Sequence, residues 1–323
     1  MPTSRSSDRD SLGAKLGRGF VLLVSAATVL VLLATAGGFL GRWFWRLELL
    51  CHPRVQYFWC LALAAAVMLA ARRWRMGAAA ALGAIVNLAL VAPVYWPARV
   101  PPTAGEALHL VSFNVLSSNA RYADVLTYLR REDADVVLLL EVSPAWAEQL
   151  PALRDVYPHQ HRSPRSNDFG IALLSKQPWS EVRTVESHDV EIPYIVAQFD
   201  RGGEKLTIIG AHPPPPLSAW MFRERNEQLS AVAQLARQAP GKTIVAGDLN
   251  ITSFSPFFGD LLRDSGLRDS RQGFGVHTSW SPGLPLMGLT IDHCLVSPNI
   301  AVRSHEIGPD LGSDHRPVSV VLQ

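Results

Sequence analysis

The sequence is poor in cysteine, with three in 323 residues. Cys51 and Cys60 lie in or near an apolar N-terminal region, and Cys294 stands alone in the rest of the chain. The C-terminal part therefore cannot form an internal disulfide. Such a cysteine-poor part is compatible with either redox compartment. The chain also shows no internal repeat.

Charge is missing from the 21 residues between Phe20 and Leu40. At about 1.5 Å per residue, this run is long enough to cross a hydrocarbon core of about 30 Å. It is too long for the apolar core of a signal peptide, which usually has about 7–15 residues. The run therefore predicts a transmembrane helix, preceded by a cytoplasmic tail at residues 1–19.

Two further apolar runs follow, near Tyr57–Ala71 and Gly77–Trp96. Together with the first run they predict a transmembrane region over residues 20–96 with about three helices. The alternative is two spans with a re-entrant middle run. The next segment, 97–106, contains three prolines and is expected to be a semi-rigid linker.

The distribution of basic residues predicts the orientation of these helices. With three spans, the N-terminal tail and the second loop lie on one side and hold seven Lys/Arg, against four on the other side. Cytoplasmic loops usually hold the excess of Lys and Arg. We therefore expect a multi-pass protein of the cell membrane with its N-terminus in the cytoplasm and its C-terminal domain outside.

Basic charge is scarce in the C-terminal part. Before residue 106 there are 11 Lys/Arg and 3 Asp/Glu, a net charge of about +8. From Glu106 onward there are 19 Lys/Arg and 25 Asp/Glu, a net charge of about −6. Proteins that grip duplex DNA without sequence preference usually present a basic surface. The acidic balance therefore counts against avid binding of duplex DNA.

The C-terminal part, 107–323, alternates apolar strands with helical patterns. Helices are expected at 122–131 and 220–238. Strands are expected at 109–115, 135–140, 171–174, 195–199, 206–210, 243–246, 291–296 and 316–322. The mixture of βα units and consecutive strands predicts a mixed α/β or two-sheet layered fold.

Polar side chains stand at or beside the ends of several expected strands, where α/β proteins place their ligands. They are Asn114, Glu141, His212, Asp248, Asn250, Asp292, Asp314 and His315. Taken singly, each has an ordinary interpretation as a turn, cap or surface residue. Their occurrence together at strand ends favours a functional site.

The chemistry of this set favours a hard cation. It is rich in carboxylate and carboxamide oxygen and contains no cysteine, which suits Mg²⁺, Mn²⁺ or Ca²⁺ better than zinc. Glu141 with Asn114 fits Mg²⁺, which usually takes one or two protein carboxylates and completes its shell with water and phosphate. The Asp–His pairs would supply oriented acid or base groups.

The ordered motifs SFNV, LLLEV, FGIALLSK, GAHPP, GDLN, IDHCLV and GSDHRPV resemble the endonuclease/exonuclease/phosphatase superfamily over roughly residues 108–323. The apolar N-terminal region is similar to that of a membrane-bound bacterial branch. The resemblance implies a DNase I-like four-layer sandwich of two mixed β-sheets flanked by helices. It also implies a metal-dependent phosphoesterase, with Mg²⁺ or Mn²⁺ as cofactor.

The resemblance also implies roles for single residues. Glu141 would be the main metal ligand, with Asn114 assisting metal or phosphate and Asp314 helping the metal site or positioning His315. Asp248 would orient or deprotonate water, and Asn250 would hold phosphate or water. His212 and His315 would bind phosphate or act as acid and base, with Asp292 orienting His315.

Substrate contacts match the family more loosely. The family often has an arginine or tyrosine that contacts phosphate, and the nearest candidates are Tyr194, Arg165 and Asn167. Trp280 would stack on a base or pack on a head group, although a packing role at the rim is as well supported.

The expected substrate is a phosphodiester or phosphomonoester: a phospholipid head group, a small phosphoester or nucleic acid. The acidic domain and the membrane region favour a lipid or a soluble phosphoester, with membrane lipid as a partner and no known protein partner. The alternatives are an extracytoplasmic nuclease acting on DNA or RNA and an inactive, membrane-tethered binding module. The expected residue type at all the family's site positions favours an enzyme.

Overall fold

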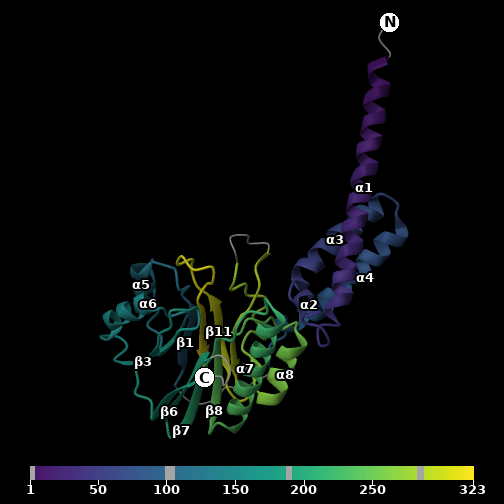
Figure 1. Cartoon of the computed structure of the whole chain (residues 1–323). Helices are drawn as coiled ribbons and strands as arrows, with labels where there is room; N and C mark the ends of the chain where they lie inside the picture. Colours follow the sequence, from purple (N-terminus) through teal and green to yellow (C-terminus); the bar gives the residue numbers. More distant parts are fainter. Residues whose placement is uncertain (1–3, 99–105, 187–190, 282–286) are drawn as a thin grey trace. The chain divides into compact units, whose positions relative to one another are not determined.

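The structure, a computed structural model, describes residues 4–98, 106–186, 191–281 and 287–323, with side chains from residue 15 onward. Most of the expected linker, 99–105, lies outside the described residues. The chain divides into a helical unit, Met1–Pro93, and a catalytic unit, Val94–Gln323, each described here by itself (Figure 1).

The helical unit contains three long helices. These are α1 (Ser4–Gly38), α3 (Arg54–Ala70) and α4 (Trp74–Val91); the short α2 (Trp45–Glu48) and η1 (Leu49–Cys51) precede α3, and η2 (Ala92–Tyr95) follows α4. Two stretches, Lys15–Gly38 and Trp74–Tyr95, are long and apolar enough to cross a membrane. The α2–η1 segment and α3 form a pair bent by 65° that could make a third span.

Close contacts show the relative direction of α3 and α4. A Cβ on Gly77 would lie 2.7 Å from the Leu69 side chain, and one on Gly83 would lie 2.9 Å from the Leu61 side chain. Small residues at such positions let helices approach closely. One contact lies near the turn between the two helices and the other lies further along both, so α3 and α4 pack antiparallel over much of their length.

A buried polar group joins the three helices at the end opposite the α3–α4 turn. Arg54 donates to Thr35 O (2.9 Å) and to Asn87 Oδ1 (3.4 Å), and Asn87 Nδ2 donates to Thr35 Oγ1 (3.0 Å). Arg54 is one of the four basic residues that the orientation count assigned to the loop after the first span and the exit, and its exposed fraction is 2%. A buried charge of this kind needs its partners, so Arg54 fixes how the helices pack.

The catalytic unit holds two six-stranded mixed sheets. Sheet A has the order β11-β12-β1-β2-β4-β3, and sheet B has the order β5-β6-β7-β8-β10-β9. The strands of sheet A are β1 (Leu108–Asn114), β2 (Val136–Leu140), β3 (His159–Ser163), β4 (Ile171–Ser175), β11 (Val302–Ile307) and β12 (Val318–Leu322). Those of sheet B are β5 (Glu181–Glu186), β6 (Pro193–Arg201), β7 (Glu204–Gly210), β8 (Lys242–Asp248), β9 (Arg268–Asp269) and β10 (Asp292–Val296).

The two sheets have the same topology. In each, one central parallel pair, β1–β2 or β7–β8, is flanked by antiparallel pairs. The helices α5 (Tyr122–Glu132) and α7 (Ala219–Gln238) make the two crossovers, and α6 (Pro144–Gln149) and α8 (Pro256–Ser265) follow β2 and β8. The two sheets thus share strand order and strand directions, although β11 and β12 of sheet A come from the end of the chain and the sequence shows no repeat. This arrangement places the carboxyl ends of both parallel pairs where ligands bind in α/β sheets.

Three apolar cores separate four layers. One core lies between the sheets and includes Leu138 of β2 and Ile208 of β7. A second lies outside sheet A and includes Trp146 of α6, and a third lies outside sheet B and includes Leu229 of α7. The predicted α/β four-layer sandwich of two mixed sheets flanked by helices is confirmed.

The closest approach of the two sheets predicts a sensitive position. A Cβ on Gly210 would lie 2.4 Å from Leu138 Cδ1 in the core between the sheets. We expect Gly210→Val to destabilise the catalytic unit by about 1–3 kcal/mol, because an overpacked core must shift side chains and backbone. Thermal unfolding of the full chain in detergent measures this.

The matched control is Gly259→Ala on α8. A Cβ there would meet nothing within 4 Å, and the position is exposed. Because alanine in a helix interior is favoured over glycine by roughly 0.5–1 kcal/mol, this variant is expected to unfold at the same temperature or higher. Equal unfolding temperatures for Gly210→Val and the wild type would contradict the packing described here.

Candidate active site

Strand ends bring the predicted residues together. Asn114 ends β1, His212 follows β7 by two residues, and Asp248 ends β8. The antiparallel register pairs Asp248 directly with Asp292, the first residue of β10. Asn114, Asp248 and Asp292 are at most 1% exposed, and His212 is 3% exposed. Each sheet therefore contributes the carboxyl ends of its parallel strands to one buried polar cluster.

Two site residues adopt an unusual backbone conformation. Glu141 has φ 58° and Asn250 has φ 49°. Glu141 comes directly after β2, and Asn250 comes two residues after the end of β8. Non-glycine residues in the left-handed region are uncommon, and they concentrate at functional sites where the surroundings hold them. The chain thus turns sharply after β2 in one sheet and after β8 in the other.

Asn114 links the two sheets at the site. Its Nδ2 donates to Glu141 Oε1 (2.9 Å) and to Asp248 Oδ2 (3.2 Å). Its Oδ1 accepts from Leu116 N (3.1 Å), which fixes the orientation of the amide. Asn114 therefore presents hydrogen-bond donors, and not its oxygen, to the carboxylates of Glu141 and Asp248.

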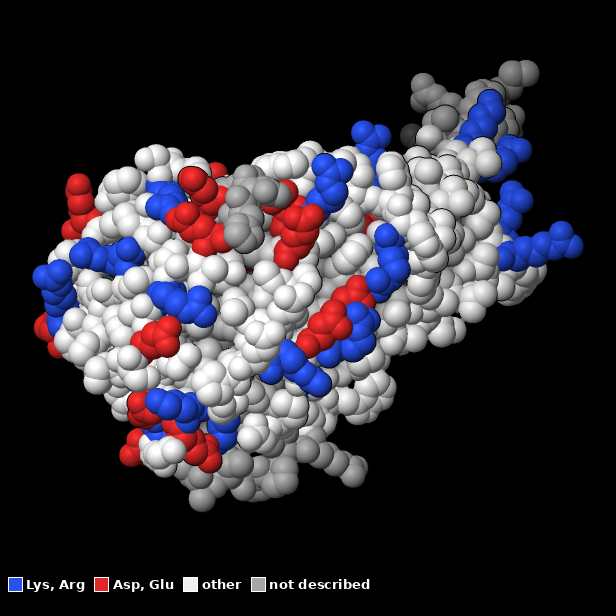
Figure 2. Space-filling model, turned by 60° about the horizontal axis from the view of Figure 1, so that its bottom comes forward, with Lys and Arg blue, Asp and Glu red and all other residues white. Residues whose placement is uncertain are grey.

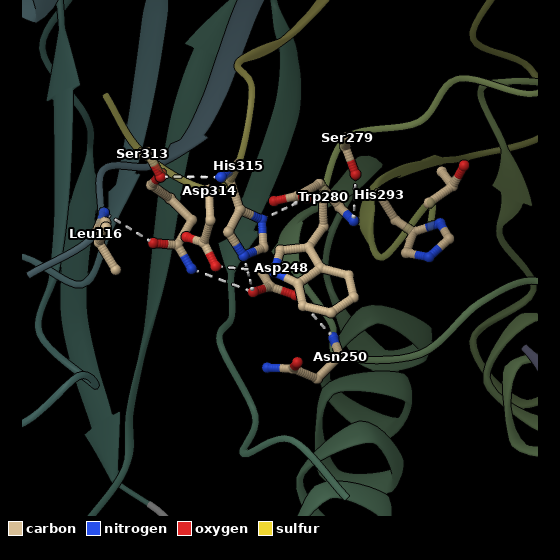
Figure 3. Close-up of polar contacts among 12 residues, drawn as sticks. Leu116, Asp248, Asn250, Ser279, Trp280, His293, Ser313, Asp314 and His315 are labelled. Atoms are coloured by element: carbon tan, nitrogen blue, oxygen red, sulfur yellow. Dashed lines mark hydrogen bonds and ion pairs between the residues drawn. The ribbon is translucent and has the colours of Figure 1, made fainter. Parts of the chain in front are cut away.

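A row of interacting acidic and histidine side chains crosses the site. His315 Nδ1 bonds Asp292 Oδ2 at 2.8 Å, and His315 Nε2 lies 3.4 Å from Asp248 Oδ2 (Figure 3). His212 Nε2 lies 3.4 Å from the same Asp248 oxygen. Two histidines and the Asn114 amide thus converge on one buried carboxylate. This arrangement can hold an anionic group and move protons.

The charges in this row of side chains shift the pKa values of His315, His212 and Asp248. Burial lowers the pKa of His315, but Asp292 and Asp248 outweigh burial and raise it to about 10. Burial likewise lowers the pKa of His212, and its contact with Asp248 more than offsets this and raises it. Burial raises the pKa of Asp248, but His315 and His212 outweigh burial and lower it to about 2. Asp248 is therefore ionised and His315 is cationic near neutral pH.

Asn250 and Asp314 complete the cluster from its edges. Asn250 N donates to Asp248 Oδ1 (3.0 Å), and Asn250 Nδ2 donates to Pro213 O (2.9 Å). Asp314 Oδ2 accepts from Trp280 Nε1 (2.9 Å). Trp280 thus positions a carboxylate of the site, a contact that its sequence context did not reveal.

The loosely matched substrate candidates make contacts of other kinds in the structure. Tyr194 is buried in the core between sheet B and α7, where burial raises its pKa. Arg165 forms an ion pair with Glu186. Asn167 is exposed, and its Oδ1 accepts from Phe169 N (3.1 Å).

Other residues at the site were not singled out from the sequence. The Phe169 ring lies 5.7 Å from that of His212. Ser117 N donates to Glu141 Oε2 (3.0 Å), and Ser117 Oγ donates to Asp168 Oδ1 (2.6 Å). Phe169 opens the motif FGIALLSK, so position within a motif was the available signal.

Two serines orient the acidic and basic groups. Ser279 Oγ accepts from Asp292 N (3.2 Å). Ser313 Oγ donates to Asn114 O (2.8 Å) and accepts from His315 N (3.0 Å). The serine of the GSDH motif therefore joins β1 to the segment that holds His315.

The cluster can hold a cation. One ligand atom from each of Asp248, Asp292 and His315 lies within 4.8 Å of the others. Asp292 Oδ1 and Asp314 Oδ1 are buried and have no hydrogen-bond partner among the described residues. Because buried carboxylate oxygens are costly without a partner, the donor set fits a divalent metal.

A second buried polar group lies behind the site. Asp269 and Arg271 form an ion pair at 2.7 Å, with their side chains 6% and 2% exposed. Burial lowers the pKa of His305 to about 3; Asp269 raises it, whereas His277, Arg271 and His293 lower it. His305 Nδ1 bonds Ser270 Oγ at 2.9 Å. His305 is therefore neutral in the folded protein near pH 7.

This neutral histidine predicts an acid-sensitive fold. An unfolded histidine titrates near pH 6.5, so the contribution of His305 is complete above that pH and is lost as pH falls toward about 3. At pH 5 the loss is about 2 kcal/mol. We expect His305→Asn to reduce the fall in unfolding temperature between pH 7 and pH 5. An unchanged pH dependence would contradict this assignment.

Comparison with known proteins agrees with the fold. Residues 111–315 match the family described as Endonuclease/Exonuclease/phosphatase family. A Bacillus subtilis (strain 168) exodeoxyribonuclease is 26% identical over 256 residues, covering 67% of this chain and 99% of the relative.

Solved structures share the fold. D. rerio TDP2 complexed with a single-stranded DNA product has a TM-score of 0.56 and 19% identity, covering 68% of this chain and 99% of that one. Sphingomyelinase C from Streptomyces griseocarneus has a TM-score of 0.51 and 18% identity, with coverages of 67% and 99%. The chain belongs to the endonuclease/exonuclease/phosphatase family, whose members are hydrolases acting on phosphoester bonds.

Proposed function

We propose that this protein is a membrane-anchored phosphodiesterase that uses a divalent metal and water. The observation that supports this most strongly is the buried chain Asp292–His315–Asp248, bridged by Asn114 to Glu141. It combines carboxylates for a cation, a cationic histidine, His315, for phosphate and an ionised carboxylate for water. A packing role alone would not require so many buried charges, because each is costly to desolvate.

Glu141 and Asp314 are the proposed ligands of Mg²⁺ or Mn²⁺. Glu141 is part-exposed at the site, and Asp314 Oδ1 lacks a partner among the described residues. His315 is a poorer ligand, since both its nitrogens face carboxylates and its pKa is raised to about 10. When bound, the metal would stabilise negative charge on a phosphoryl oxygen.

The chain's own residues would handle the proton and the phosphate. Asp248 would orient water and accept its proton. Asn250 would donate an amide hydrogen to phosphate or water, and Asn114 would keep Glu141 and Asp248 in position. His212 or His315 would protonate the leaving oxygen, and Asp292 would keep His315 cationic and fixed in direction. Water adds to phosphorus, the bond from phosphorus to the leaving oxygen breaks, and that oxygen takes a proton.

The function is tested with the full chain in detergent and bis-p-nitrophenyl phosphate as the probe. We expect nitrophenol release in Mg²⁺ or Mn²⁺, loss of release with EDTA, and recovery when metal is restored. Running p-nitrophenyl phosphate beside it distinguishes a diesterase from a monoesterase. Release that is indifferent to EDTA, or absent in every metal from folded protein, would argue against the proposal.

The membrane topology is a further part of this proposal. The antiparallel packing of α3 with α4 supports three spans, because α3 then lies at the same depth as α4. In that arrangement the basic residues of the tail and of the α3–α4 turn share one side, which is expected to be cytoplasmic. The catalytic unit would then lie outside.

This topology predicts the behaviour of reporter fusions. A periplasm-active phosphatase fused after Gln323 is expected to be active, and a cytoplasm-active fluorescent protein fused there is expected to be dark. Fusions after Arg73 should give the opposite pattern. A C-terminal fusion that fluoresces would favour two spans with a re-entrant α3.

An extracytoplasmic nuclease is the second candidate. The named activity of the Bacillus subtilis relative and the DNA product in the TDP2 complex favour it. The acidic balance of the C-terminal part counts against avid duplex binding. On the face shown in Figure 2, basic and acidic side chains are interspersed and neither sign forms a continuous patch.

A further inference from the structure

Exposed large apolar side chains are few in the described part of the catalytic unit, and their places are informative. They are Tyr95 (59% exposed), Trp96 (66%), Leu217 (72%), Trp220 (46%) and Met287 (54%). Scattered single residues of this kind need no explanation. Here, however, each lies on a segment that leads either to the site or to the membrane helices.

Leu217 and Trp220 lie on the segment that begins at His212. Four prolines follow His212 directly, and proline runs are stiff and extended. Leu217 comes next, and Ser218 caps α7 by accepting from Met221 N (3.1 Å). The first turn of α7 has no acidic residue. The proline run thus holds the apolar side chains of Leu217 and Trp220 a short way along the chain from His212.

Met287 lies on a second segment that leads to the site, through the bridge between Leu289 and Trp280. It comes two residues before Leu289, which pairs with Trp280 in an antiparallel bridge. Trp280 also bridges His315 and donates to Asp314. Met287 therefore sits on a segment that is tied directly to the catalytic cluster.

The first residues of the catalytic unit contact the segment that leads to Trp280. Val94 O accepts from Gly273 N (2.9 Å) and Gly275 N (3.2 Å). A Cβ on Gly275 would lie 2.6 Å from the Tyr95 ring, so the contact is tight. From Gly275 the chain reaches Trp280 within five residues, at most about 17 Å when extended. Trp280 is thus close to the point where the chain enters the catalytic unit.

The candidate span continues in the sequence directly into the catalytic unit. The candidate span Trp74–Tyr95 ends within η2, and Val94 already belongs to the catalytic unit. The exposed Tyr95 and Trp96 are of the type enriched at membrane interfaces. The catalytic unit therefore begins directly after a candidate membrane span, with aromatic residues of the interfacial type at the junction.

We propose that Leu217, Trp220 and Met287 form a rim that enters the outer surface of the bilayer, and that the substrate is a phospholipid phosphodiester lying in that bilayer. This inference rests on the proposed function and names its substrate class. Tryptophan and aliphatic side chains favour the lipid interface, and the lack of acidic residues in the first turn of α7 avoids repulsion from anionic lipid. Water adds to the lipid phosphorus, the bond to one alcohol oxygen breaks, and that alcohol leaves with a proton.

The test uses the full chain reconstituted in vesicles of phosphatidylethanolamine and phosphatidylglycerol, with Mn²⁺. Phosphate-containing products released from these lipids are measured beside hydrolysis of soluble bis-p-nitrophenyl phosphate. The variant is Leu217→Ser/Trp220→Ser/Met287→Ser. We expect it to lower the ratio of lipid to soluble-diester hydrolysis by at least about tenfold.

The matched control is Glu204→Ser/Lys205→Ser, at the start of β7 and therefore at the opposite end of that strand from His212. It is expected to keep the wild-type ratio. The inference is overturned if the rim variant keeps that ratio, or if the wild type cleaves single-stranded DNA and the soluble diester but no vesicle lipid. If the wild type also leaves the soluble diester intact, the proposed function itself fails and the inference falls with it.

Discussion

Replacing Asp248 by asparagine is expected to lower the turnover of a phosphodiester by about 10³-fold, within the range that positioned acid–base groups contribute. Asp248 is 1% exposed and faces Asn114, His212 and His315 through one oxygen. Asparagine keeps the shape of the side chain but cannot accept a proton from water. It also removes the charge that raises the pKa of both histidines.

Turnover number and KM are measured for Asp248→Asn, with the fold checked by circular dichroism. The matched control is Asp264→Asn on α8, which removes the same charge from an exposed ion pair with Arg263. Exposed pairs contribute little, so this variant should match the wild type. If Asp248→Asn retained more than about a tenth of wild-type turnover, Asp248 could not be the group that activates water.

Replacing Glu141 by glutamine is expected to weaken metal binding and to lower activity by about 10³-fold at subsaturating Mn²⁺. Glu141 is the part-exposed carboxylate that Asn114 and Ser117 orient through both of its oxygens. Glutamine preserves the size of the side chain but loses the negative charge that a hard cation needs. The loss should be partly recovered by raising the Mn²⁺ concentration, in contrast to Asp248→Asn.

Calorimetric titration of Mn²⁺ into the full chain provides a readout independent of turnover. We expect Glu141→Gln to have a larger dissociation constant for Mn²⁺ than the wild type. Glu148 is exposed on α6, so Glu148→Gln should bind Mn²⁺ as the wild type does. Equal Mn²⁺ affinity for Glu141→Gln and wild type would contradict the assignment of Glu141 as a ligand. The triad of Asp248, Asp292 and His315 would then become the better candidate.

The parts of the fold that sequence could predict are those with strong apolar patterns. The continuous run of β2 and the amphipathic α7 were expected within one residue of where they occur. Several elements were missed. β3, for instance, is the half-buried, histidine-rich edge strand His159–Ser163, whose polar side chains carry no alternating signal. α8 was missed because its ten residues are short and contain a glycine.

The candidate site was predictable where motif order alone identified residues, and not where distance in the sequence hid a contact. Asn114, Glu141, Asp248 and His315 were expected together because each stands at or beside a strand end. The contact of Trp280 with Asp314 spans 34 residues and depends on how the loop folds back. Tyr194 was a candidate for substrate contact, and its side chain packs in the outer core beside α7; a strand residue can face either side, which the motif alone does not decide.

The helical unit shows a similar limit. Its apolar runs were visible in the sequence, but Arg54 looked like a loop charge because its partners lie on two other helices. Buried polar groups of this kind are satisfied by tertiary contacts that no local pattern reveals. Their presence is consistent with a specific helical bundle rather than a loose tether.

The central claim is that water, activated at this buried cluster, attacks phosphorus. Hydrolysis of bis-p-nitrophenyl phosphate in ¹⁸O-labelled water with Mn²⁺, followed by mass spectrometry of both products, tests it most directly. We expect one ¹⁸O atom in the released nitrophenyl phosphate, none in nitrophenol, and neither product above background with Asp248→Asn. Label in nitrophenol, or undiminished label transfer by Asp248→Asn, would contradict it.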